Sequence, residues 1–318
     1  MLTLAACGAP DAAVPDAPRS TVPTSPAGTF DVTSAIDLPV PAAAAPVLAI
    51  LSGLGDDPDD PSRFVLDRVI DRLPDGALKT LAAGAAPYLA AYLNTQLATV
   101  APDLVTGLHG LSDGLSRIAD HVATRETWTI DDAGHTTRAI TRFVFDVAGH
   151  ATEVGLADAG LAAPKVTTQA QLAQGARLVI AEHVQPIAYG SWLRLGLERA
   201  VVPAVVPAAT DLAAALTALV DCDGLAAVLA ARLAVGAPGV YATACRAAMT
   251  YLAGQVDAEL AAIDQVAMTL ELAGDANALD DDGDGAADRL TAGSWVGTLH
   301  AAVDETIGAA QFTGVRQP

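Results

Sequence analysis

A short acidic segment near the C-terminus has the residue types and the spacing of a cation site. It reads as D-x-D-x-D-G-x-x-D and offers four candidate ligands, Asp280, Asp282, Asp284 and Asp288. Calcium takes about six to eight hard oxygen ligands, and carboxylates at alternate positions of a tight loop converge on one point. Gly285 permits the sharp turn that this convergence needs. The sequence therefore predicts calcium as a cofactor in a structural role, because the bound cation would order the loop.

The same nine residues resemble the calcium loops of EF-hand-like, dockerin and thrombospondin type 3 sequences. The segment departs from the EF-hand pattern because Thr291 stands where that loop has its bidentate glutamate. Its flanks also have the residue pattern of strands. The resemblance implies weak binding, with a dissociation constant of about 10⁻⁴–10⁻³ M, as in extracellular modules. The alternative is a solvated acidic hairpin tip without an ion.

The beginning of the chain carries a motif for lipid attachment. Leu4-Ala5-Ala6-Cys7 resembles the lipobox of bacterial lipoproteins. That resemblance implies cleavage before Cys7, a lipid anchor on its thiol, and export to the outer membrane. The anchored protein would then sit on the periplasmic face or at the cell surface, with the membrane as its partner. Six residues precede Cys7, so we expect the signal peptide to begin upstream.

Residues 8–46 follow as a tether rich in proline and alanine. Proline removes backbone donors and fixes φ, and few side chains in this range can build a core. We therefore expect residues 1–7 to be the remnant of the signal, 8–46 to be disordered, and 47–318 to form one domain. The uncharged stretch 38–55 is interrupted by prolines, which favours a short docking helix over residues 42–54 rather than a membrane span.

The remaining cysteines are candidates for a disulfide. Cys222 and Cys245 each lie near the end of an apolar helical run. In an exported protein they can pair and pin two helices together. Two buried thiols are the alternative.

Other motifs give little support for catalysis. Gly110-Leu111-Ser112-Asp113-Gly114 matches G-x-S-x-G, but Ser112 lies inside a helical stripe rather than after a strand. The nearby glycines are expected to permit close helix packing. No pair of histidines has zinc-ligand spacing, and Glu182-His183 is expected to be a surface pair. The expectation is therefore that the protein is not an enzyme, with a hydrolase of unrecognised site as an alternative.

Composition limits the partners. The chain has 318 residues and a formal net charge of −20, with 52 % hydrophobic and 4 % aromatic residues. That charge argues against nucleic acid and against binding of anionic headgroups by charge. The apolar fraction is enough for a large core built from Ala, Leu and Val.

The chain alternates between helical and strand patterns. Residues 61–121 and 186–260 have helical periodicity, whereas 123–184 and 264–316 alternate as strands joined by short turns. Short turns favour antiparallel pairing. The expected fold is α+β, with an antiparallel sheet from two sequence-distant strand blocks packed with Ala/Leu-rich helices.

The tryptophans suggest where a ligand could bind. Trp128 and Trp295 lie in the two strand blocks, and Trp192 opens a helix. Core packing is the simplest role for them, and an apolar cavity between sheet and helices is the alternative. The predicted function is a structural or binding role in a lipid-anchored envelope protein. The alternative is a periplasmic carrier of a lipid or other apolar ligand. The whole resembles uncharacterised, Ala-rich predicted lipoproteins, and the sequence identifies no protein partner.

Overall fold

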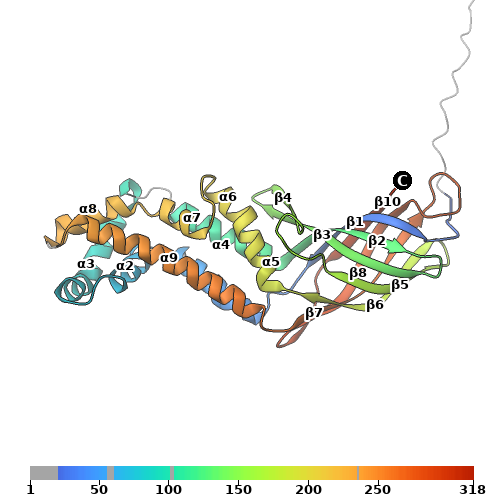
Figure 1. The fold of residues 1–318 in the computed structure, drawn as a ribbon, viewed down its shortest axis with the longest axis horizontal. Coiled ribbons are helices and arrows are strands. Elements are labelled where there is room, and N and C mark those ends of the chain that lie inside the picture. The colour runs from blue at the N-terminus through green and yellow to red at the C-terminus, as the bar shows by residue number, and fades with distance from the viewer. Residues whose placement is uncertain (1–20, 56–60, 101–103, 235) are drawn as a thin grey trace, which may run out of the picture.

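The structure is a computed structural model that describes residues 21–55, 61–100, 104–234 and 236–318. Cys7 and the lipobox lie outside the described residues. A β-barrel forms one end of an elongated molecule, and helices extend from the other end of the barrel (Figure 1). We call these helices, α1 to α9, the helical arm.

Eight antiparallel strands close the barrel. Their order is β1-β2-β3-β5-β6-β7-β8-β10, and β10 pairs again with β1. The short strands β4 and β9 pair only with β3 and β8. The bounds are β1 Gly28–Asp37, β2 His121–Ile130, β3 His135–Val147, β4 His150–Gly155, β5 Lys165–Ala173, β6 Arg177–Ile187, β7 Met268–Leu279, β8 Arg289–His300, β9 Asp304–Thr306 and β10 Ala310–Arg316.

The predicted fold class was wrong, because the sheet is a closed barrel and not an open sheet packed with helices. The difference lies in β1, which occupies part of the range assigned to the disordered tether. Along β1, buried Phe30, Val32, Ser34 and Ile36 alternate with more exposed neighbours. The strand pairs with β2 on one side and with β10 on the other. It therefore joins the two predicted strand blocks into a ring.

The helices form two insertions at the same end of the barrel, which we call the helical end. The first insertion lies between β1 and β2, and the second between β6 and β7. The opposite end, the turn end, carries the turns at 131–134, 174–176 and 280–288. The bounds are η1 Ala42–Ala44, α1 Ala45–Gly55, α2 Pro61–Asp71, α3 Ala77–Val100, α4 Leu104–Asp120, α5 Tyr189–Gly196, η2 Leu197–Val201, α6 Val202–Val205, α7 Leu212–Leu219, α8 Cys222–Leu233 and α9 Pro238–Ile263.

Several predicted features of the helical arm are confirmed. The docking helix corresponds to η1 and α1, and the three helices α2, α3 and α4 lie within the range predicted to be helical, 61–121. Gly110 and Gly114 let α4 approach Val205 and Val201, since an added Cβ would lie 3.0 and 2.7 Å from their methyl groups. Cys222 and Cys245 form a disulfide that joins α8 to α9.

No single helix among the described residues is both long and apolar enough to cross a bilayer. Together, α7 and α8 have the length and composition of a membrane span, but they are bent by 48° relative to each other.

Candidate functional site: the barrel lumen and the acidic loop

A buried ion pair lies at the centre of the barrel lumen. Glu126 on β2 and Arg138 on β3 are 4 % and 2 % exposed. The guanidinium donates from Nη2 to both carboxylate oxygens, at 3.0 and 2.9 Å, and from Nε to Oε2 at 3.0 Å. This forked geometry is the strong form of an arginine–carboxylate pair. The pair compensates two charges that would be costly to bury separately.

Neighbouring lumen side chains complete the hydrogen bonding of this pair. Trp128 Nε1 donates to Glu126 at 2.7 Å, and the Thr124 hydroxyl donates to it at 2.9 Å. The guanidinium also contacts His183 Nε2, and its centre lies 4.5 Å from the centre of the Trp295 ring. We call this group, Thr124, Glu126, Trp128, Arg138, His183 and Trp295, the lumen cluster. Its ionic charges cancel when His183 is neutral.

The environment of His183 favours the neutral ring. Burial lowers the pKa of His183 below its ordinary value of 6.5, and the positive charge of Arg138 adds to this effect. Nδ1 lies 2.9 Å from the carbonyl oxygen of Ala181 and donates to it. Nε2 is then the acceptor for the Arg138 guanidinium. The predicted surface pair with Glu182 was wrong, because Glu182 is exposed and His183 points into the lumen.

We expect acid to destabilise the fold through His183. The unfolded chain binds this proton near pH 6.5, and the folded chain only at lower pH. The free energy of unfolding therefore falls as the pH drops below 6.5, by at most about 1.4 kcal/mol per pH unit. Urea unfolding between pH 7.5 and 5.5 measures this slope.

The matched variant is His183→Gln, which keeps an acceptor for the guanidinium but does not titrate. Its slope should be smaller than that of the wild type. His300 contributes to the pH dependence of the free energy of unfolding with the opposite sign, because its hydrogen bond to Asp304, aided by Glu271, raises its pKa. It is present in both proteins and cancels in the difference. Equal slopes for the two proteins would contradict a neutral, buried His183.

A cavity of about 180 Å³ lies in the lumen between the lumen cluster and the helical arm. Its walls come from the helical ends of the strands and from α5. The apolar lining includes Ile36, Val122, Ile140, Phe143, Leu270 and Trp192. Glu126, Arg138 and Thr124 form part of its lining on the lumen side. The connection between β4 and β5 contributes Leu161 and Ala162, which are exposed, so the cavity reaches the surface.

The tryptophans have both of the roles that sequence analysis considers. Trp128 and Trp295 pack in the lumen with Phe312, with ring centres 4.6 to 5.7 Å apart. Gly274 makes room for Trp295, since a Cβ there would lie 2.5 Å from its ring. Trp192, at the start of α5, lines the cavity instead.

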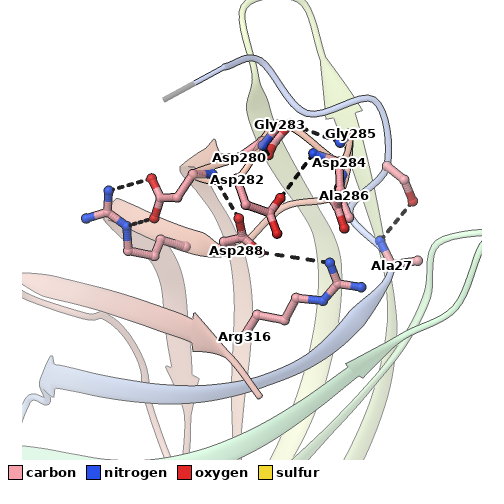
Figure 2. A network of polar contacts seen from close by, with 12 residues as sticks. Ala27, Asp280, Asp282, Gly283, Asp284, Gly285, Ala286, Asp288 and Arg316 are labelled. Carbon is pink, nitrogen blue, oxygen red and sulfur yellow. Dashed lines mark hydrogen bonds and ion pairs between the residues drawn. The ribbon is translucent and has the colours of Figure 1, made fainter. Parts of the chain in front are cut away.

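The acidic loop lies at the turn end of the barrel, away from the helical arm (Figure 1), and Figure 2 shows its side chains. Among the described residues, Asp280, Asp282 and Asp288 each bring one carboxylate oxygen within 4.8 Å of the others. This group could hold a metal ion. Two oxygens on one calcium ion are at most about 5.2 Å apart, which this spacing satisfies. Asp284, the fourth predicted ligand, is not part of the group.

Hydrogen bonds shape the loop from within. Asp280 is buried and accepts from the backbone N–H groups of Gly283 and Gly285, at 2.6 and 3.0 Å. Asp288 accepts from the Asp281 N–H at 2.8 Å, and Asp284 accepts from Ala286 at 2.7 Å (Figure 2). Gly285 has φ +89°, a conformation that glycine adopts without strain.

The N-terminal segment that precedes β1 packs against this loop. Thr21 forms backbone hydrogen bonds with Asp280, and its hydroxyl donates to the Asp280 carboxylate at 2.7 Å. That hydrogen bond, supported by the loop N–H groups, lowers the pKa of Asp280 below its ordinary value. Arg289 pairs with Asp281, and Arg316 lies 4.0 Å from Asp288. Asp280 is thus ionised and held in place at neutral pH.

The residues of a hydrolase site are not brought together by the described structure. Ser112 lies half-buried within α4 in the helical arm, and His183 lies in the lumen cluster. The ion pair was missed in sequence analysis. The sequence signal for it was the two-residue spacing of Thr124, Glu126 and Trp128, which places all three side chains on one face of the strand.

Three comparisons with known proteins complete the description of the site. No family model, no curated protein and no solved structure matches this chain.

Proposed function

We propose that this chain is a binding protein that holds a small apolar molecule in the lumen cavity. The observation that carries the proposal is the position of that cavity, enclosed by the barrel and α5 and open beside the β4–β5 connection. Apolar pockets with few polar groups are the usual form of small-molecule sites. A ligand there would remove its apolar surface from water, which is favourable at about 25 cal/mol per Å².

Binding fits the chemistry of the cavity better than catalysis does. A general base needs a free lone pair, and a general acid a transferable proton, within reach of the substrate. Glu126 instead accepts from Arg138, Trp128 and Thr124, and His183 is engaged by Arg138 and Ala181. These groups are therefore positioned to support the barrel.

A native mass spectrum of detergent-free protein from an oxidising compartment tests the binding role. We expect an added mass that survives gentle ionisation and leaves as a small neutral molecule on activation. The added mass should be lost in the Ala162→Trp variant, in which an indole occupies the cavity mouth. A bare protein mass that remains bare after incubation with small apolar compounds would contradict the proposal.

We also propose that the metal of the acidic loop is calcium. All three carboxylates offer hard oxygens, and the loop backbone turns around Asp280. With a dissociation constant of about 10⁻⁴–10⁻³ M, 5 mM calcium would stabilise the fold by about 1–2 kcal/mol. This should raise the melting temperature by a few degrees relative to EDTA.

Scanning calorimetry with and without calcium checks this prediction. Asp282→Asn should remove most of the calcium-dependent increase. Asp131→Asn is the matched control, because Asp131 caps another turn at the same barrel end, where it accepts from Ala133 and His135. Its calcium response should equal that of the wild type. A wild-type melting temperature that does not respond to calcium would rule out the ion.

We further propose that Cys7 is lipidated and that the protein is exported to the cell envelope. The lipobox motif supports this proposal, and so does the Cys222–Cys245 disulfide, since such bonds persist in oxidising compartments. Expression from the full genomic reading frame with a palmitate analogue should label the wild type but not Cys7→Ser. A wild type that takes up no label would contradict the lipidation of Cys7.

A further inference from the structure

We infer that the lumen cavity selects an uncharged molecule of one ring or one short chain, with a single hydrogen-bonding group at its outer end. This inference rests on the proposed binding function and adds the chemical class of the ligand. Three features carry it: the volume of the cavity, the charge balance of its lining, and the side chain of Gln185.

The volume limits the size of the ligand. A cavity of about 150 Å³ lined by aliphatic and aromatic residues holds one benzene molecule. The lumen cavity, at about 180 Å³, is only slightly larger and lies below the range of about 300–1,000 Å³ for sites of drug-sized ligands. A single ring or a short chain fills it. The acyl chain of a membrane lipid is too long for this volume, so part of it would extend out of the cavity opening.

The charge balance of the lining excludes an ionic group inside. Arg138 and Glu126 neutralise each other, and His183 contacts the guanidinium as a neutral ring. No described lining residue therefore offers an uncompensated charge. Ser191, which lines the cavity from α5, donates to Asp264, so a carboxylate lies next to the lining. A buried carboxylate of a ligand would lack a counterion and would face this negative charge and the overall charge of −20.

Gln185 supplies the hydrogen-bonding group. It lies half-buried on β6 and lines the cavity. Within the described lining, the structure shows no hydrogen bond to the protein for the Gln185 amide or for the Trp192 indole N–H. The Gln185 amide offers both a donor and an acceptor, whereas the indole offers only a donor. A hydroxyl or amide on the ligand can therefore pair with Gln185 while the apolar part enters the lumen.

Isothermal titration with simple probes tests the inference. The chain-length series consists of butan-1-ol, hexan-1-ol, octan-1-ol and dodecan-1-ol, and hexanoate is the charged partner of hexan-1-ol. We expect affinity to rise about fourfold per methylene while the chain fills the cavity and to level off by octan-1-ol. Hexanoate should bind at least tenfold more weakly than hexan-1-ol. Gln185→Leu should weaken hexan-1-ol several-fold without weakening toluene.

Two adjacent tryptophan substitutions localise the binding. Ala162 and Ala163 are both exposed in the β4–β5 connection, but only Ala162 lines the cavity. Ala162→Trp should abolish hexan-1-ol binding, whereas Ala163→Trp should bind like the wild type. Circular dichroism confirms that both variants fold.

The outcomes separate this inference from the proposed function. Hexanoate binding as tightly as hexan-1-ol, or affinity that climbs through dodecan-1-ol, would overturn the selectivity and leave a lumen binding site in place. Equal binding by the Ala162→Trp and Ala163→Trp variants would show that hexan-1-ol binds outside the lumen cavity. No binding of any probe would overturn both the inference and the proposed function.

Discussion

Replacing Glu126 with leucine is expected to lower the free energy of unfolding by about 3–5 kcal/mol, the usual cost of leaving one partner of a buried ion pair uncompensated. Arg138 would remain in the lumen at 2 % exposure without its carboxylate. Trp128 and Thr124 would also lose their acceptor. Urea unfolding, followed by tryptophan fluorescence, measures the change.

An exposed ion pair on the same barrel provides the control. Arg125 on β2 and Glu153 on β4 lie 2.9 Å apart on the outer face, with side chains 46 % and 37 % exposed. Glu153→Leu should cost no more than about 1 kcal/mol, because water screens such pairs. The double variant Glu126→Leu with Arg138→Leu should recover part of the loss, since no buried charge remains. A Glu126→Leu cost as small as that of Glu153→Leu would contradict the structural role of the lumen cluster.

Removing the disulfide is expected to have the second largest effect. The bond closes a loop with a sequence separation of 23 residues between α8 and α9, and both cysteines are buried. Constraint of the unfolded chain by a loop of this length contributes about 3 kcal/mol. The double variant Cys222→Ala with Cys245→Ala should therefore unfold at lower urea concentration when helix content is followed by circular dichroism.

Reduction of the wild type is the control for this experiment. A reducing agent should destabilise the wild type by a similar amount and leave the double alanine variant unchanged. Trp128 and Trp295 lie in barrel strands and Trp192 in α5 beside the barrel, so tryptophan fluorescence reports mainly on the barrel, whereas circular dichroism reports on the helices. A loss below about 1 kcal/mol in both the variant and the reduced wild type would mean that packing, not the bond, holds α8 on α9.

Local patterns predicted much of the helical arm and the strands. The helical periodicity of residues 61–121 predicted α4, and the short turns expected within 123–184 predicted the antiparallel pairing of β2 with β3. The candidate metal ligands followed from spacing within one loop, where neighbours in sequence are neighbours in space. The cysteine pair followed from its place at the ends of apolar helical runs.

The closure of the barrel could not be predicted in this way. It depends on Phe30 pairing with Arg316 and with Trp128, contacts far apart in sequence. Prolines on both sides of β1 gave that range the composition of a tether. The cavity could not be predicted either, because its volume depends on the distance between Trp192 on α5 and the barrel strands. That distance cannot be inferred from the sequence of any single segment.

Xenon derivatisation of crystals tests the central claim, that the lumen holds an apolar site, most directly. Xenon enters dry apolar cavities and is visible by its anomalous scattering. We predict one strong site bounded by Ile140, Phe143 and Trp192, above the lumen cluster. It should be lost in Ala162→Trp crystals. Ordered water filling the cavity, with no xenon bound there, would contradict an apolar binding site in the barrel lumen.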